Sequence, residues 1–116
     1  STGLLAGLFD EKVSRALAKI HAQPEKHWSL ESLARESLMG RSAFSQRFNQ
    51  LVGMSVMQYL TAWRMQEAKQ MLEKTSLSII DIALRCGYES EAAFRKSYKK
   101  IMAETPGATR QQMKNN

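Results

Sequence analysis

The chain has 116 residues, 43% of them hydrophobic, which suits one globular unit or two very small units that share a scaffold. Lysine and arginine exceed aspartate and glutamate by 17 to 11, and either an anionic partner or a merely solvated basic surface would account for the net charge of +6. One cysteine excludes an internal disulfide and its distance from both histidines leaves no metal-binding pattern, so we expect a protein of the reducing cytoplasm with no metal and no cofactor.

The longest apolar run, residues 3–9, is far shorter than the ~20 residues that span a bilayer, and no basic leader precedes it. We therefore expect neither a membrane span nor a signal peptide, and we interpret residues 1–9 as a linker or N-terminal tail. Prolines occur only at positions 24 and 106, and no segment alternates between polar and apolar residues. These features predict an all-α fold.

A first unit of three helices is predicted over residues 10–54. Its first helix begins after Asp10, a natural N-cap, and ends by Pro24. The second helix begins after Ser29, and the third follows a short turn and stops at Gly53. Apolar residues recur every three or four positions along these helices and should face inward: Val13, Ala16, Leu17, Ile20, Leu30, Leu33, Ala34, Phe44, Phe48, Leu51 and Val52.

Residues 55–75 predict one long connecting helix, which Ser55 opens. Its apolar stripe is too wide for one partner, so the helix should pack against both units. At ~1.5 Å per residue, its roughly nineteen helical residues would span about 28 Å. Major-groove segments on one face of DNA lie about 34 Å apart, so such a spacer would suit two helices that enter successive grooves.

A second unit is predicted over residues 76–113. Ser78 and Ser90 are natural N-caps of a short and a longer helix, and Gly87 supplies the freedom that a sharp turn between them needs. The inward positions predicted from the spacing are Ile79, Ile82, Ala83, Phe94, Tyr98 and Ile101. A last helix or turn should run from residue 107 to about 113, with a polar tail at 114–116.

The two units form an internal repeat. Leu33 and Ala34 recur as Ile82 and Ala83, at an offset of 49 positions. The aromatic residues at positions 44 and 48 recur at positions 94 and 98, an offset of 50, because the second turn holds one extra residue. The sequence therefore predicts two helix-turn-helix units in one chain.

The second unit carries a specific family pattern, I-x-x-I-A-x-x-x-G-Y-x-S-x-x-x-F-x-x-x-Y-K-K, followed by T-P and Arg110. This run closely resembles the second helix-turn-helix of the AraC/XylS family of bacterial transcription regulators. The resemblance covers roughly residues 29–110 and implies about seven helices, two of which read DNA, and control of transcription initiation. It also implies a longer regulator with an N-terminal sensing or dimerisation domain, and RNA polymerase as a further partner.

Carried over by position, the family's base-reading surface falls on outward residues of two helices: Arg41, Ser42, Ser45, Gln46, Glu91, Ala92, Arg95 and Lys96. Backbone contacts fall on Arg47, Asn49, Lys99 and Lys100. Arginine can bridge guanine and glutamine can bridge adenine, whereas lysine mainly neutralises phosphate. Glu91 could accept a hydrogen bond from cytosine or only stabilise its helix N-terminus.

Four positions depart from the family pattern. Leu38 stands where the family usually has glycine, and Gly40 stands where it has a serine cap. Ala103 replaces the glycine before T-P, and Thr109 replaces the usual aromatic residue before Arg110.

The leading hypothesis is sequence-specific binding of double-stranded DNA. The alternative is a helical protein-interaction module whose basic helix meets an acidic partner, although the repeated turn geometry argues against it. We do not expect an enzyme, because no nucleophile, base and orienting partner cluster and no phosphate-binding glycine loop occurs. We interpret Cys86 as a buried small apolar residue rather than a reactive thiol.

Overall fold

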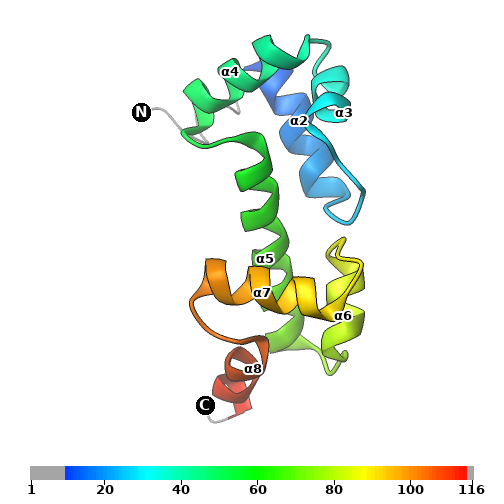
Figure 1. The fold of residues 1–116 in the computed structure, drawn as a ribbon, viewed down its shortest axis with the longest axis vertical. Coiled ribbons are helices and arrows are strands. Elements are labelled where there is room, and N and C mark those ends of the chain that lie inside the picture. Colours follow the sequence, from blue (N-terminus) through cyan, green and yellow to red (C-terminus); the bar gives the residue numbers. More distant parts are fainter. Residues whose placement is uncertain (1–9, 115–116) are drawn as a thin grey trace. The chain divides into compact units, whose positions relative to one another are not determined.

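The computed structural model describes residues 10–114, so the predictions for residues 1–9 and 115–116 lie outside the described part of the chain (Figure 1). Residues 10–114 form seven α-helices and no strand, which confirms the all-α fold. The helices, numbered as in Figure 1, are α2 (Glu11–Ala22), α3 (Leu30–Glu36), α4 (Arg41–Val52), α5 (Val56–Lys74), α6 (Ile79–Arg85), α7 (Glu91–Met102) and α8 (Pro106–Lys114). The described residues divide into two compact units, unit 1 up to residue 60 and unit 2 from residue 61, and the boundary falls within α5.

Unit 1 contains α2, α3, α4 and the start of α5. Asp10 caps α2 as predicted, because its side chain accepts a hydrogen bond from the backbone nitrogen of Val13 at 2.9 Å. Ser29 and Ser32 bond to each other's backbone nitrogens and so cap α3 reciprocally. The buried core of unit 1 is Val13, Ala16, Leu17, Ile20, Trp28, Leu33, Ala34, Phe44, Phe48, Val52, Val56, Tyr59 and Leu60. Leu30 and Leu51, also predicted to face inward, are half-buried.

The turn between α3 and α4 has the same backbone form as the turn between α6 and α7. Each contains one residue with positive φ, which is Leu38 at 59° in the first turn and Gly87 at 88° in the second. The amide nitrogen of the following residue then bonds at 3.0 Å to the carbonyl oxygen of an alanine in the preceding helix, Ala34 or Ala83. The repeat in the sequence is therefore a repeat in the structure.

Helix α5 begins after Ser55, as predicted. The backbone nitrogen of Ser55 donates to the side chain of Gln58 at 3.0 Å, and that of Gln58 donates to the Ser55 hydroxyl at 3.1 Å. The helix then continues without interruption to Lys74. Its first buried residues belong to the core of unit 1, and its later ones to the core of unit 2.

Unit 2 buries the rest of α5 with α6 and α7. Its core cluster consists of Met65, Ala68, Leu72, Ile82, Ala83, Cys86, Phe94 and Tyr98. Ser78 and Ser90 cap α6 and α7 as predicted, accepting from the backbone nitrogens of Asp81 at 3.2 Å and Ala93 at 3.1 Å. Ile79 is only partly buried against this cluster.

One predicted inward position in unit 2 is wrong. Ile101 is 44% exposed, and Met102 packs against the core instead. Helix α8 contacts α7, and the Tyr98 hydroxyl lies 2.7 Å from that of Thr109. This contact places the buried side of the end of α7 at Tyr98 and Met102, so Ile101 faces solvent. Helix α8 itself starts at Pro106 and ends at Lys114, one residue beyond the predicted end on each side.

Candidate nucleic-acid interface

The outer face of α4 forms an open depression in unit 1. The lining residues that we predicted are Arg41, Ser42, Ser45, Gln46 and Asn49. Leu30 and Gln50 complete the lining, and neither was among the predicted site residues. The spacing already held the signal for Gln50, because it lies one helical turn after Gln46. The depression therefore presents hydroxyl, amide and guanidinium groups, which are the groups that read base edges.

The helix α4 starts without a side-chain cap. Its N-cap residue is Gly40, which has an extended backbone and forms no capping hydrogen bond, whereas Ser90 caps the equivalent helix α7. At the other end, Gly53 takes a left-handed conformation with φ of 87° and its amide bonds to the Asn49 carbonyl at 2.9 Å. Gly40 therefore lacks the capping bond that a serine would supply, and α4 still begins at Arg41.

The two arginines of α4 are held by carboxylates from other segments of unit 1. Arg41 lies 3.5 Å from Glu31 of α3, and both side chains are well exposed. Arg47 donates from Nε to Asp10 at 2.6 Å and also pairs with it through Nη2. Asp10 is 9% exposed, and this hydrogen bond is the main reason why its pKa lies below the ordinary value. Arg47, predicted as a DNA-backbone contact, is thus also part of the α2 cap.

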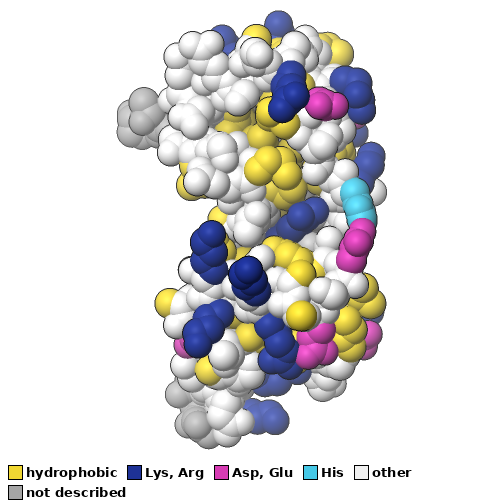
Figure 2. All heavy atoms as spheres, viewed as in Figure 1, with side chains coloured by type: hydrophobic (Ala, Val, Ile, Leu, Met, Phe, Trp, Pro, Cys, Tyr) yellow, Lys and Arg dark blue, Asp and Glu magenta, His cyan; other side chains and the backbone are white. Residues whose placement is uncertain are grey.

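The outer face of α7 in unit 2 is cationic. Arg95, Lys96, Lys99 and Lys100 are all exposed, and Figure 2 shows dark-blue side chains gathered over this part of unit 2. Arg95 donates from Nε to Glu91 at 2.7 Å. Within residues 10–114 none of the three lysines forms an ion pair, so their charges are available to an anionic partner. Ala92 is exposed on the same helix.

Arg110 has a structural role that we did not predict. Its guanidinium donates to three backbone carbonyls at the end of α5 and the segment after it, at 3.1 Å to Leu72, 3.1 Å to Thr75 and 2.7 Å to Leu77. These carbonyls lie at or beyond the helix end, where intrahelical donors run out. Arg110 therefore fastens α8 to the segment that leads into the second helix-turn-helix.

Cys86, the single cysteine, is buried in the core of unit 2. Burial, assisted by the negative charge of Glu67, raises the pKa of the Cys86 thiol to about 12, so the thiol stays protonated at neutral pH. This agrees with a buried apolar role for Cys86. Over residues 10–114 no group of three or more metal-ligating side chains gathers, and none of the described helices is long and apolar enough to cross a membrane.

Comparison with known proteins agrees with this geometry. The family profile described as "Helix-turn-helix domain" matches residues 33–112. The chain is 41% identical over 108 residues to the HTH-type transcriptional regulator AlkR of Acinetobacter baylyi, covering 93% of this chain and 35% of that protein. It is 30% identical over 112 residues to the HTH-type transcriptional regulator ExsA of Pseudomonas aeruginosa, covering 93% of this chain and 40% of that protein.

Two solved structures share the fold. The DNA-binding domain of AdpA, a global transcriptional factor in complex with a target DNA, has a TM-score of 0.86 and 26% identity, over 91% of this chain and 96% of that one. A transcriptional regulator from Chromobacterium violaceum, described as containing an AraC-type DNA-binding domain, has a TM-score of 0.82 and 29% identity, over 88% and 91%.

The fold and the site define a helix-turn-helix domain of the kind found in transcription regulators, which is not an enzyme class. The chain belongs to the AraC-type family of these domains. It spans between a third and two fifths of the length of the curated relatives AlkR and ExsA.

Proposed function

We propose that this chain binds double-stranded DNA with sequence specificity and thereby regulates the initiation of transcription. The recognition helices are α4 and α7, which enter successive major grooves. The observation that carries the proposal is that both units place an exposed twelve-residue helix, polar or cationic on its outer face, directly after the same turn. The similar AdpA domain was solved with its target DNA, which supports the same role here.

The two helices would divide the work. The outer face of α4, with Arg41, Ser42, Ser45 and Gln46, is rich in groups that form directed hydrogen bonds with bases. On α7 the base-reading positions are Glu91, Ala92, Arg95 and Lys96. Phosphate contacts fall to Arg47, Asn49, Lys99 and Lys100. Helix α4 would therefore do more of the reading and α7 more of the backbone binding.

Further partners would lie in and around a longer protein. Because the chain spans only 35% of AlkR and 40% of ExsA, we propose that it acts as the DNA-binding part of a regulator with a separate sensing or dimerisation domain. RNA polymerase would be its partner at the promoter. Such a protein would work in the bacterial cytoplasm, where the chromosome lies.

The salt dependence of duplex binding tests the proposal. Fluorescence anisotropy with a labelled duplex should show affinity that falls steeply with salt, and Lys99→Ala should flatten the log–log slope by about 1 because one fewer counterion is released. As a control, Lys12→Ala removes one positive charge from an exposed position on α2, and it should leave the slope unchanged. Binding that does not respond to salt, or equal effects of the two changes, would contradict the proposal.

A further inference from the structure

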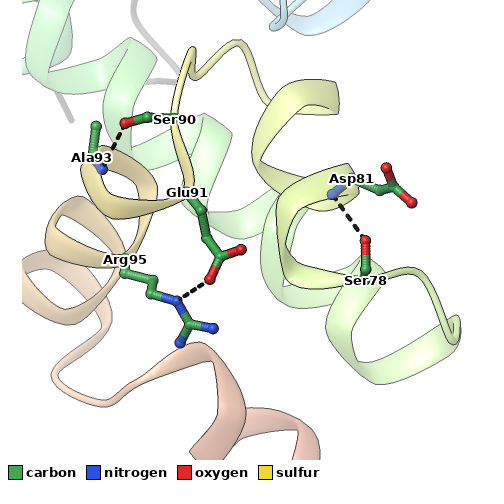
Figure 3. A network of polar contacts seen from close by, with 6 residues as sticks. All are labelled: Ser78, Asp81, Ser90, Glu91, Ala93 and Arg95. Carbon is green, nitrogen blue, oxygen red and sulfur yellow. Dashed lines mark hydrogen bonds and ion pairs between the residues drawn. The ribbon is translucent and has the colours of Figure 1, made fainter.

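Arg95 is the one arginine of α4 and α7 that is held by its own helix. Its Nε donates to Oε2 of Glu91 at 2.7 Å, and the two residues are separated by one helical turn (Figure 3). Glutamate N-terminal to its partner is the favourable order for such a pair. The side chains are 46% and 42% exposed, so the pair contributes little to stability. The pair instead fixes the direction in which the planar guanidinium of Arg95 points.

The atom that Glu91 engages matters. A guanidinium has five N–H donors, and Glu91 takes the one on Nε. Both terminal nitrogens lie on the far side of the guanidinium from Glu91 (Figure 3), and no described residue between 10 and 114 accepts a hydrogen bond from them. Two parallel N–H groups then point outward together, which is the geometry that bridges O6 and N7 of guanine.

The other two arginines are held differently. Arg47 presents Nε and Nη2 to one oxygen of Asp10, so part of its fork is already occupied. Arg41 uses Nη1, a terminal nitrogen, for its 3.5 Å contact with Glu31. Among the arginines of α4 and α7, only Arg95 is held at Nε alone and keeps both terminal nitrogens, Nη1 and Nη2, available.

We propose that Glu91 is a specificity-determining positioning residue, which holds Arg95 at Nε so that its two terminal nitrogens meet a guanine end-on. This inference rests on the proposed function of α7 as a DNA-reading helix. Glu91, proposed above as a base-reading position, would then act on the choice of base through Arg95. The negative charge of its carboxylate lowers the affinity for any duplex, because it repels the phosphates. By orienting Arg95, the same carboxylate increases discrimination between bases.

Two substitutions of Glu91 separate orientation from charge. Both Glu91→Ala and Glu91→Gln remove the negative charge, but glutamine keeps an oxygen that can accept from Nε. Both variants should therefore bind unrelated duplex more tightly and by the same factor. Base discrimination should fall in Glu91→Ala and be largely kept in Glu91→Gln. Asp81→Asn, which removes an exposed acid from α6 away from Arg95, serves as the matched charge control.

The experiment starts from duplexes selected from a random pool with the unaltered chain. The base pair whose guanine preference is lost in Arg95→Ala is identified, and dissociation constants are measured with guanine and with each other base at that position. A bidentate contact predicts discrimination of roughly 5- to 150-fold between guanine and the other bases. Glu91→Ala should lower the discrimination at this base pair almost to the level seen in Arg95→Ala. The double variant with both substitutions should discriminate no less than Arg95→Ala alone.

Several results would overturn the inference. For the Glu91 variants, these results are unaltered base discrimination in Glu91→Ala, or an equal loss of discrimination in Glu91→Ala and Glu91→Gln. A loss of discrimination at a base pair other than the one that Arg95 reads would do the same. So would a further loss of discrimination in the double variant, or the absence of any guanine preference that depends on Arg95. If the unaltered chain shows no preference among duplexes, the proposed function fails as well. Sequence preference in the unaltered chain combined with any of the other results refutes the role of Glu91 alone.

Discussion

Two residues, Leu38 and Ala103, take left-handed backbone conformations without being glycine. Their φ angles are 59° and 63°, and both stand where the family pattern has glycine. Each side chain is exposed, so little buried contact offsets the conformational cost. For an L-residue this conformation costs roughly 1–2 kcal/mol.

Ala103 and Gly53 make a matched pair for measuring that cost. Each is the left-handed C-cap of a twelve-residue helix, and each amide bonds to a carbonyl of the last turn, at 3.0 and 2.9 Å. We expect Ala103→Gly to raise the free energy of unfolding by about 0.5–1 kcal/mol, because the gain exceeds the added freedom of the unfolded chain. Gly53→Ala should lower the free energy of unfolding by a similar amount, because it places alanine in the same left-handed conformation. No atom lies within 4 Å of the new Cβ, so no steric clash adds to this cost. Urea unfolding checks both, and a loss of stability in Ala103→Gly would be the contrary result.

The ion pair between Asp10 and Arg47 makes part of the stability of unit 1 depend on pH. Because the pKa of folded Asp10 is lowered, mainly by the hydrogen bond from Arg47, the pair stabilises above the unfolded pKa. That contribution is lost as the pH falls through the folded pKa. Arg47→Ala should therefore cost about 1 kcal/mol at pH 7 and progressively less below about pH 4.

Urea unfolding at pH 7 and pH 3 measures this difference. Arg41→Ala is the control, because its 3.5 Å contact joins two exposed groups and should contribute almost nothing at either pH. A cost of Arg47→Ala that is the same at both pH values would show that the pair with Asp10 is not its cause.

At the scale of elements, Arg110 makes α8 a brace for the second helix-turn-helix. It satisfies three carbonyls at the end of α5 and in the segment before α6. Arg110→Lys cannot reproduce the planar fork, and we expect it to destabilise unit 2 by about 2 kcal/mol. Hydrogen exchange should show loss of protection in α6 and α7, with α2 and α3 of unit 1 as internal controls. Unchanged exchange in unit 2 would rule out the bracing role.

The helices could be predicted from the sequence because their signals are local. Caps such as Ser78 and Ser90, and the left-handed stop at Gly53, fix helix ends through contacts a few residues away. The apolar spacing likewise identified the buried faces of α2 and α4. The candidate site residues lie outside these apolar faces, and most of them are exposed. Their roles in binding DNA come from the family resemblance and stay a prediction.

Contacts between distant segments could not be predicted in this way. Ile101 has the spacing of a buried residue, but it is exposed and Met102 packs against the core of unit 2 instead. Thr109 departs from the family's aromatic residue, and the structure shows its hydroxyl bonded to Glu104 and Tyr98 in place of ring packing. Met65 of α5 is fully buried, although the predicted apolar stripe of that helix did not include it. The burial and the contacts of these three residues depend on which helix packs against them.

At the scale of the molecule, the two similar units differ in the chemistry of their proposed recognition helices. The outer face of α4 is mostly neutral and polar, whereas α7 carries one arginine and three lysines. Neutral donors and acceptors give directed contacts with little affinity of their own, and cations give affinity with little direction. A chain with both should need both units for tight and selective binding.

Selection of bound duplexes from a random pool tests the central claim, that α4 and α7 both read one DNA duplex. We expect two separate clusters of preferred bases, with centres about 10 base pairs apart. Gln46→Ala should erase preference in one cluster only, and Arg95→Ala in the other only. A single cluster, or one that both substitutions weaken equally, would contradict it.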